Sequence, residues 1–325
     1  MFNSDLSRME LQRVSRLSLK DSWFLLLALL ITAVTLLGTN LPGENRLMYS
    51  LQDSGHFLIF TLLTLAAMWP FRNMGYRLVW PVMFLVLMFG VLMEAVQSFI
   101  GREPSLYDLL MDMLGIAAGG ILYAGFIRCS FSSRRAVVIV ITLALAAFSQ
   151  PLYWFVVYQV RADQFPRLVD TDNYFSRALL EGSAGGEVRH IDLPGEWSLP
   201  TDLNIHTCAY VSLLGGRWPG VDMQEPEADW RGYTSLELLV YSDQLDDLPL
   251  TLRIHDQSHN RQLEDRYNRS LVIRPGYNHF SLPLHEVKDA PSARTMDMAA
   301  ISDVMIFATQ SRIGRGFCLL SMGLR

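Results

Sequence analysis

The chain has 325 residues, half of them hydrophobic, and a formal net charge of -5. This charge argues against a nucleic-acid partner, because domains that bind nucleic acids carry a clustered excess of Lys and Arg. Three cysteines are too few for a disulfide framework, and their spacing fits no metal site. The length allows two domains, and the sequence changes near residue 158 from long apolar runs to mixed, turn-rich segments.

Five apolar runs in the first half predict membrane-spanning helices, after a polar and basic N-terminal segment over residues 1–21. The first run lacks the small-x-small cleavage site of a signal peptide, so we expect it to be retained. The predicted membrane domain covers residues 22–158, with a kink at Pro151. The expected spans are residues 23–38, 58–69 with flanks, 78–99, 106–126 and 136–158.

The basic residues predict the orientation of this domain. The N-terminal segment and the loops at 71–77 and 128–135 hold nine Lys and Arg residues, and the two opposite loops hold two. Cytoplasmic loops carry the excess of Lys and Arg, so we expect the N-terminus in the cytoplasm. Everything after Tyr158 is then extracytoplasmic, in the periplasm if the membrane is a bacterial inner membrane.

Seven polar residues lie at the expected outer ends of the second, third and fourth spans: Asp53, His56, Glu94, Gln97, Arg102, Asp108 and Asp112. Spacings of three and four residues put the members of each helix on one face. Charged groups inside a membrane are costly and are therefore candidates for function. We expect an outward-facing polar pocket for a headgroup or a proton. The alternative is a structural salt-bridge cluster that fastens three helices together.

In their order and spacing, these residues resemble the VanZ-like membrane family over roughly residues 40–127. The matching pieces are Asp53-x-x-His56, Glu94-x-x-Gln97, Arg102-x-Pro104-Ser105-x-x-Asp108 and Gly115. The family commonly has Asn where this chain has Asp112. Its founding member is associated with glycopeptide-antibiotic tolerance, and the resemblance implies no particular reaction. Gly115 and Gly119 form a GxxxG pattern, which predicts close helix packing.

The second half is predicted to contain a stalk or linker over residues 159–186 and a β-sandwich over residues 187–325. Eight short segments of strand pattern alternate with turn signals: 187–192, 206–214, 233–242, 248–255, 269–274, 277–282, 301–308 and 316–324. This spacing predicts an antiparallel, jelly-roll β-sandwich outside the membrane. The run Asp229-Trp230-x-x-Tyr233-x-x-Leu236-x-Leu238-x-Val240-Tyr241 resembles galactose-binding-like jelly rolls, the fold of many carbohydrate-binding modules.

One polar segment of the sandwich is our candidate for saccharide binding. Its candidate residues are Arg253, His255, Asp256, Asn260, Asp265, Arg266 and Asn268. Planar donors and acceptors near Tyr and His suit sugar hydroxyls and ring faces. Two alternatives remain: a solvated hairpin with internal ion pairs, and a calcium site through Asp256, Asn260 and Asp265. We favour the absence of a metal.

Cys208 and Cys318 both fall on predicted strands of the sandwich. An oxidising compartment would allow a disulfide between them. We favour two buried free thiols over that bond.

The sequence favours a non-catalytic envelope protein without a cofactor. Its membrane pocket would bind a lipid or lipid-linked saccharide headgroup, and its sandwich an envelope glycan. One rival is a membrane hydrolase or transferase acting on a lipid-linked substrate, with His56 or Glu94 as base and Arg102 holding a phosphate. Another is a proton-coupled transporter that uses Glu94, Asp108 and Asp112 as a relay, but five spans without a visible repeat count against it. No residue is assigned a catalytic role.

Overall fold

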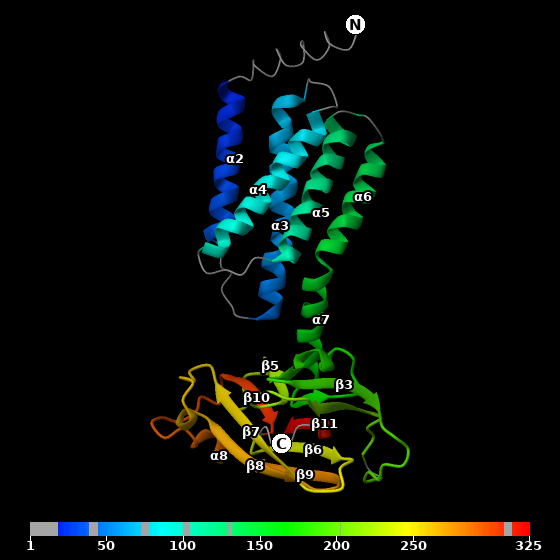
Figure 1. The fold of residues 1–325 in the computed structure, drawn as a ribbon, viewed down its shortest axis with the longest axis vertical. Coiled ribbons are helices and arrows are strands. Elements are labelled where there is room, and N and C mark those ends of the chain that lie inside the picture. The colour runs from blue at the N-terminus through cyan, green and yellow to red at the C-terminus, as the bar shows by residue number, and fades with distance from the viewer. Residues whose placement is uncertain are drawn as a thin grey trace. The chain divides into compact units, whose positions relative to one another are not determined.

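The computed structural model describes residues 19–38, 45–72, 78–99, 105–127, 129, 132–201, 203–308 and 314–325. The chain divides into two compact units, Met1–Phe155 and Val156–Arg325 (Figure 1). The first is helical and the second consists mainly of β-strands. We call them the helical unit and the sandwich unit.

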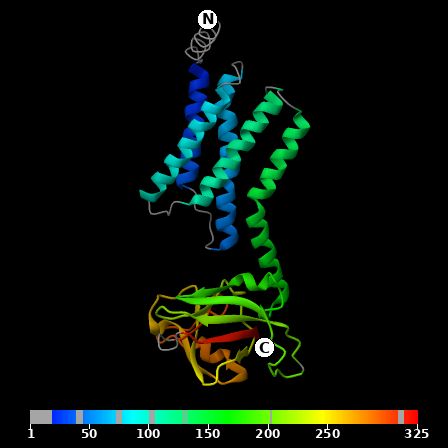
Figure 2. The ribbon, with the colours of Figure 1, turned by 45° about the vertical axis from the view of Figure 1, so that its right-hand side comes forward.

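The helical unit contains helices that lie side by side (Figure 2): α2 (Leu19–Gly38), α3 (Arg46–Met68), α4 (Val79–Phe99), α5 (Leu106–Leu122) and α6 (Ser133–Ala147). A 3-10 turn, η1 (Trp69–Phe71), continues α3, and a π-helical turn, η3 (Tyr123–Ile127), continues α5. The central helix α3 contacts α2, α4 and α5. Its buried Phe60 packs in one apolar cluster with Val86 of α4 and Ile116 of α5.

Three described helices are long and apolar enough to cross a membrane: Arg46–Phe71, Val79–Phe99 and Leu106–Ile127. A fourth span results if α6 and the following α7 (Ser149–Gln164) are counted as one. In α2, the apolar stretch among the described residues is the shorter Trp23–Thr35. Large apolar side chains cover the outside of the unit, and Trp80 of α4 is 72% exposed. Such a surface fits a lipid environment. The arrangement of five spans stays a prediction.

The expected kink lies three residues before Pro151. Helices α6 and α7 meet at a 49° bend, at Phe148. Proline has no N–H to donate, so Pro151 leaves the carbonyl of Ala147 without its intrahelical donor. The hydroxyl of Ser54 in α3 donates to this carbonyl at 2.7 Å. The break therefore also attaches α3 to α6.

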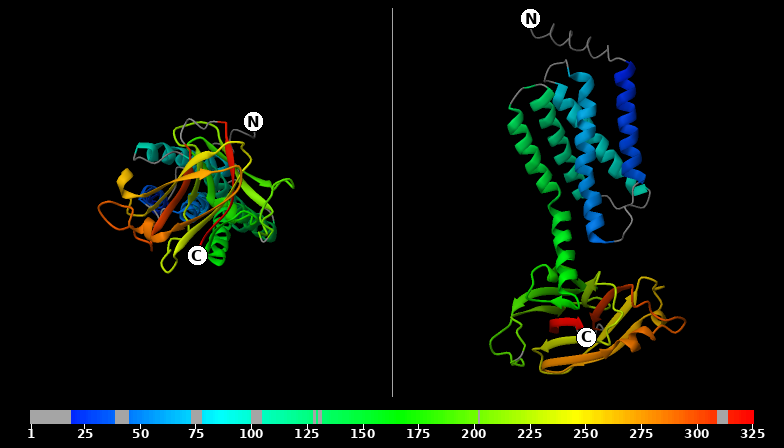
Figure 3. Two further views of the ribbon diagram at one scale, coloured as in Figure 1. Left: turned by 90° about the horizontal axis from the view of Figure 1, so that it is seen from below. Right: turned by 180° about the vertical axis from the view of Figure 1, so that it is seen from behind.

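The sandwich unit has two antiparallel sheets (Figure 3). One sheet has the order β3-β4-β11-β6-β9, with β1 paired to β11, and the other has the order β2-β5-β10-β7-β8. The strands are β1 (Arg167–Asp170), β2 (Leu180–Ser183), β3 (Gly186–Asp192), β4 (Thr207–Leu213), β5 (Gly220–Gln224), β6 (Ser235–Ser242), β7 (Leu248–Asp256), β8 (Tyr267–Ile273), β9 (Gly276–Pro283), β10 (Ile301–Phe307) and β11 (Gly316–Leu324). A short helix, α8 (Leu284–Lys288), follows β9.

The core of the sandwich follows from strand alternation. In β6, buried and half-buried residues alternate, and Leu236, Leu238 and Val240 point inward. Their partners in the core include Leu252 of β7 and Phe317 of β11. Because successive side chains point to opposite faces, the residues between the core positions face outward from the sheets.

The predicted β-sandwich is confirmed, and all eight expected strands have counterparts among the observed ones. The structure corrects the expected stalk or linker over residues 159–186. Within residues 159–186, β1 pairs with β11 and β2 pairs with β5, so both belong to the sandwich. The sequence pattern also did not predict β5 (Gly220–Gln224). These strands have only four or five residues, too few for a clear alternation of polar and apolar positions.

The structure also corrects the preference for two free thiols. Cys208 of β4 and Cys318 of β11 form a disulfide, with Cα atoms 5.7 Å apart. Strands β4 and β11 are neighbours, and Cys318 lies opposite Tyr210, two residues from Cys208. The two cysteines therefore share one face of the sheet, and both are fully buried there. The sequence alone could not show that the last strand lies beside β4.

Candidate functional site

Three buried polar side chains meet inside the helical unit: His56 of α3, Glu94 of α4 and Asp112 of α5. Nδ1 of His56 lies 2.9 Å from Oδ1 of Asp112. One ligand-capable atom from each of the three residues lies within 4.8 Å of the other two. The His56 ring stacks on Phe60 with a centroid distance of 6.4 Å. We call His56, Glu94 and Asp112 the His56 cluster.

Glycines allow the helices to come close enough to form this cluster. A Cβ added to Gly115 would lie 2.5 Å from the carbonyl oxygen of Phe57, and one on Gly119 would lie 2.7 Å from that of Thr61. The predicted close packing of the GxxxG pattern is therefore confirmed, and its partner is α3. Phe57 follows His56, and Gly115 lies one turn after Asp112. The same contact therefore brings His56 opposite Asp112.

The start of α5 connects to the cluster through Glu94. The hydroxyl of Ser105 caps α5 by accepting hydrogen bonds from the N–H groups of Tyr107 and Asp108. The N–H of Ser105 donates to Oε2 of Glu94 at 3.2 Å. The Glu94 carboxylate is therefore held by backbone that precedes Asp112 by two turns.

The residues predicted for the membrane pocket lie as follows in the structure. His56, Glu94 and Asp112 converge, and Asp108 lies near enough to act electrostatically on His56. Gln97 is buried three residues after Glu94, and Asp53 is half-buried. Arg102 lies outside the described residues. The structure therefore brings four of the seven predicted residues near one another.

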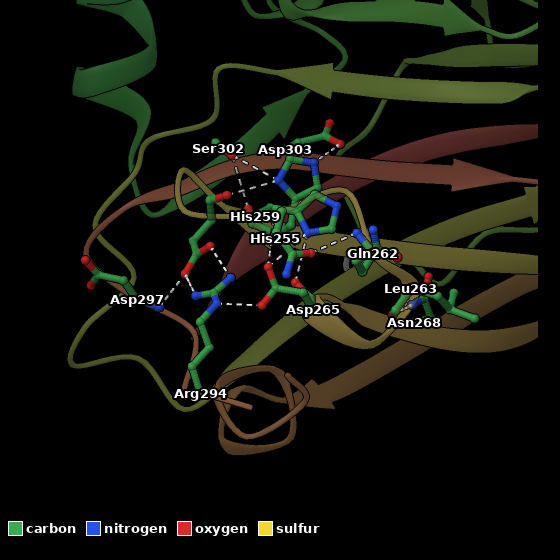
Figure 4. A network of polar contacts seen from close by, with 12 residues as sticks. His255, His259, Gln262, Leu263, Asp265, Asn268, Arg294, Asp297, Ser302 and Asp303 are labelled. Carbon is green, nitrogen blue, oxygen red and sulfur yellow. Dashed lines mark hydrogen bonds and ion pairs between the residues drawn. The ribbon is translucent and has the colours of Figure 1, made fainter. Parts of the chain in front are cut away.

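The predicted saccharide residues divide into two groups (Figure 4). Arg253 and His255 lie on the outer face of β7, where both contact the carboxylate of Asp303 in β10, at 2.6 and 3.0 Å. The second group surrounds Arg294. Its guanidinium contacts both oxygens of Asp256, at 2.5 and 2.8 Å, and donates to Asp265 at 2.6 Å.

The second group holds loops together. Asp256 is completely buried and also accepts the N–H of Asp297 at 2.7 Å, and Asp265 accepts the N–H of Asn260 at 2.8 Å. Arg294 supplies the positive charge that the proposed calcium ion would have supplied. These contacts leave Asp256 buried under Arg294 rather than on an exposed concavity.

The remaining predicted residues lie beside these two groups. Asn268 donates to the carbonyl of Leu263 at 3.5 Å and is exposed. Burial lowers the pKa of the half-buried Arg266, and the charge of Arg253 adds to this effect. His255 stacks on His259, with ring centroids 4.5 Å apart. Burial, followed by the charge of His255, lowers the pKa of His259.

Asp222 of β5 joins Arg253 and His255 on the outer face of the five-stranded sheet. Burial raises its pKa, and a hydrogen bond to Asp303 raises it further. Burial also opposes ionisation of Asp303, but hydrogen bonds from His255, Asp222 and Arg253 hold the pKa of that carboxyl well below its usual range. The pKa of Asp222 is raised to about 8 and that of Asp303 is lowered, so at neutral pH the pair holds its proton on Asp222.

A groove of about 760 Å³ crosses the outer face of the six-stranded sheet. We call it the β6–β9 groove. Its floor follows the strand register: Glu237 of β6 lies opposite Ser281 of β9, Leu239 opposite His279, and Tyr241 opposite Tyr277. The described residues that line it are Gln164, Pro166, Arg167, Leu203, Glu237, Leu239, Tyr277, His279, Ser321, Gly323, Leu324 and Arg325.

Glu237 carries the only side-chain carboxylate among these described lining residues. It accepts hydrogen bonds from the hydroxyls of Ser235 and Ser281 and from Nε2 of His279, each at 2.6 Å. Burial raises the pKa of Glu237, but these hydrogen bonds outweigh burial and lower it. The groove floor therefore presents an ionised, fixed acceptor on β6, and the ring of Tyr277 lies on the neighbouring strand β9, four register positions further along.

An apolar layer borders the groove. Trp197 stacks on Tyr241 with a centroid distance of 4.1 Å, and Leu193 and Ile205 cover the Cys208–Cys318 disulfide. Leu239 and Tyr277, which line the groove, also pack against this layer. In the sequence this face is marked by Glu237, Leu239 and Tyr241, which alternate with core residues, and this alternation predicted the strand but no site.

No protein-family model matches the chain, and no curated protein matches its sequence. Solved structures match the sandwich unit. The family 11 carbohydrate-binding module of Clostridium thermocellum in complex with a β-1,3-1,4-mixed-linked tetrasaccharide is 14% identical, with 45% of this chain and 86% of that chain covered and a TM-score of 0.34. The CBM22-1 xylan-binding domain of Paenibacillus barcinonensis Xyn10C is 7% identical, with 45% and 84% covered and a TM-score of 0.31.

An agarase is similar over 49% of this chain and 26% of its own length, with 15% identity and a TM-score of 0.36. At these TM-scores the similarities carry no argument about what this chain binds. The class that the fold itself defines is a helical unit with apolar helices joined to an antiparallel β-sandwich.

Proposed function

We propose that this chain is a bacterial envelope membrane protein whose sandwich unit binds a saccharide in the β6–β9 groove. One observation carries this proposal: the floor of the groove combines the fixed carboxylate of Glu237 with the aromatic ring of Tyr277. Sugars are recognised by a few fixed polar groups for their hydroxyls and by aromatic or apolar surface for their ring faces. His279 and Ser321 line the same groove and add donors and acceptors to it.

The groove favours binding over hydrolysis. Glycosidases use two carboxyl groups, about 5 to 9.5 Å apart, on either side of the bond they cleave. Among the described residues that line the groove, Glu237 is the only one with a side-chain carboxyl group. Its hydrogen bonds keep it ionised, so it is unsuited to donate a proton to a leaving group.

The helical unit is proposed to be VanZ-like and to sit in the cytoplasmic membrane with its N-terminus in the cytoplasm. In this proposal, the His56 cluster lies at the outer leaflet and contacts the headgroup of a lipid or lipid-linked saccharide. The convergence of His56, Glu94 and Asp112 supports this assignment, because such groups rarely gather inside a membrane without a function. The same convergence keeps a membrane enzyme acting on lipid-linked substrates as the second candidate.

Binding of the full chain in nanodiscs to a panel of envelope and plant polysaccharides tests the proposal. Tyr277→Ala removes the stacking surface, and Glu237→Gln removes the charged acceptor, so we expect each to weaken the strongest interaction at least tenfold. The control is Glu286→Gln, because Glu286 lies outside the groove in an exposed pair with Arg269. Binding that both groove variants retain at wild-type strength would refute the assignment to this groove.

A further inference from the structure

We propose that the His56 cluster is a binding site for a divalent transition-metal ion, with Zn²⁺ as the ion to test. The ligands are a ring nitrogen of His56 and one carboxylate oxygen each from Glu94 and Asp112. These atoms come from three different helices and already lie within 4.8 Å of one another. The proposal is independent of the saccharide site, because it concerns the helical unit alone.

The distances suit a metal site. Zn²⁺ binds imidazole nitrogen and carboxylate oxygen at about 2.0–2.2 Å, so its ligand atoms lie about 3 to 4 Å from one another. The pair His56 Nδ1 and Asp112 Oδ1 is already at 2.9 Å. A Glu94 oxygen lies within 4.8 Å of both atoms, and rotation about the side-chain torsions of Glu94 can bring it closer. A cation between these groups would take the place of the proton that His56 and Asp112 now share.

The charges also suit a divalent ion. Glu94 and Asp112 are 8% and 1% exposed, in apolar surroundings. Two carboxylates within 4.8 Å of each other in such surroundings repel each other strongly. A protonated His56 would add a single positive charge next to these two negative ones. A divalent ion neutralises both carboxylates and uses neutral His56 as its nitrogen ligand.

The surrounding groups hold the proposed ligands in place. The Ser105 N–H bonds to one oxygen of Glu94, and the Phe60 ring stacks on His56. Asp112 reaches the cluster across Gly90, because a Cβ at that position would lie 2.7 Å from Oδ2 of Asp112. Such supporting contacts orient metal ligands and adjust affinity. The small residue at position 90 therefore has a defined role in the site.

The donor set narrows the choice of metal. Imidazole suits Zn²⁺, Fe²⁺ and other first-row ions, whereas Mg²⁺ and Ca²⁺ prefer sites made of oxygen alone. Three protein ligands leave at least one coordination position of Zn²⁺ free, as in catalytic rather than structural zinc sites. Water can occupy that position.

The experiment measures the metal content of the full chain. The protein is purified in detergent without chelator, incubated with Zn²⁺, dialysed, and analysed by inductively coupled plasma mass spectrometry. We expect about one Zn²⁺ per chain for the wild type. Glu94→Gln and Asp112→Asn keep the size of the side chain but remove a charged ligand, and each should lower the content at least fivefold. X-ray absorption of the wild type should show nitrogen and oxygen ligands with one imidazole.

A matched pair of variants separates the site from casual binding to histidine. His56→Gln should lose the metal, whereas His206→Gln, which changes an exposed histidine of the sandwich unit, should keep it. Wild-type protein that holds less than about 0.1 Zn²⁺ per chain after loading would overturn the proposal, whether or not the variants fold. Equal metal content in the wild type and in well-folded Asp112→Asn protein would overturn it as well.

Discussion

Replacing Arg294 with Met should destabilise the sandwich unit more than any exchange of an exposed arginine. In the native protein the guanidinium forms two hydrogen bonds with Asp256, at 2.5 and 2.8 Å, and one with Asp265, at 2.6 Å. Methionine fills a similar volume, but the fully buried Asp256 carboxylate then keeps the N–H of Asp297 as its hydrogen-bond donor among the described residues. The loss is therefore the cost of a buried charge without its counterion.

Removing one partner of a buried ion pair costs about 3–5 kcal/mol. The Arg294 side chain is itself 27% exposed, so water can reach the place it leaves. The lower end, about 3 kcal/mol, is therefore expected. In a unit of about 170 residues, 1 kcal/mol shifts the melting temperature by about 2–4 °C, so the expected decrease is about 6–12 °C.

The assay is thermal unfolding of the full chain in detergent, followed by the protease resistance of the sandwich unit. Arg269→Met is the matched control. Its pair with Glu286 is exposed, so this substitution should cost less than about 1 kcal/mol.

The pH dependence of stability adds a second readout. Arg294 and the N–H of Asp297 outweigh burial and lower the pKa of Asp256, and Arg294 lowers that of Asp265 to about 2. The wild type should therefore lose this stabilisation as the pH falls below about 4, and Arg294→Met should lack that loss. Equal melting temperatures for the two variants would refute the reasoning.

Three further predictions concern other parts of the chain. A topology reporter fused after Tyr158 should be active only outside the cytoplasm; activity inside would contradict the proposed orientation. Burial and Asp303 raise the pKa of Asp222 in the folded protein above its usual value of 3.8. The free energy of unfolding of the wild type should therefore fall as the pH rises from 4 to 8, because Asp222 ionises more readily in the unfolded chain. Asp222→Asn removes this loss, so thermal unfolding should show its stability rising relative to the wild type over this pH range. Gly115→Ala should loosen the packing of α3 on α5 and lower the detergent melting temperature by several degrees, whereas Gly55→Ala, whose Cβ would meet nothing within 4 Å, should leave it unchanged or raise it.

The sequence predicted the two kinds of structure because both have strong local patterns. Apolar runs identify the helices, and strand alternation identifies β6 and β7 almost to the residue. The helix spacing also predicted that Glu94 and Asp112 belong to one cluster with His56. What it could not provide was the partner of each group, because pairing between helices depends on tertiary contacts such as that of Gly115 with Phe57.

The saccharide site shows the limit more clearly. The most polar segment of the sandwich attracted the prediction, yet Asp256 and Asp265 bind Arg294, which lies 29 residues or more away in the chain. The β6–β9 groove arises because β9 and β11 flank β6. Strand order of this kind is not written in local sequence. From the sequence alone, Glu237 cannot be distinguished from any other exposed glutamate, because its neighbours on β9 and β11 are not known.

The most direct test of the account is an experimental structure of the full chain with the saccharide that binds most strongly. We expect density for the sugar across β6 and β9, with a ring face on Tyr277 and a hydroxyl donating to the carboxylate of Glu237. Density on the outer face of the five-stranded sheet, beside Arg253 and Asp303, with an empty β6–β9 groove would contradict the account.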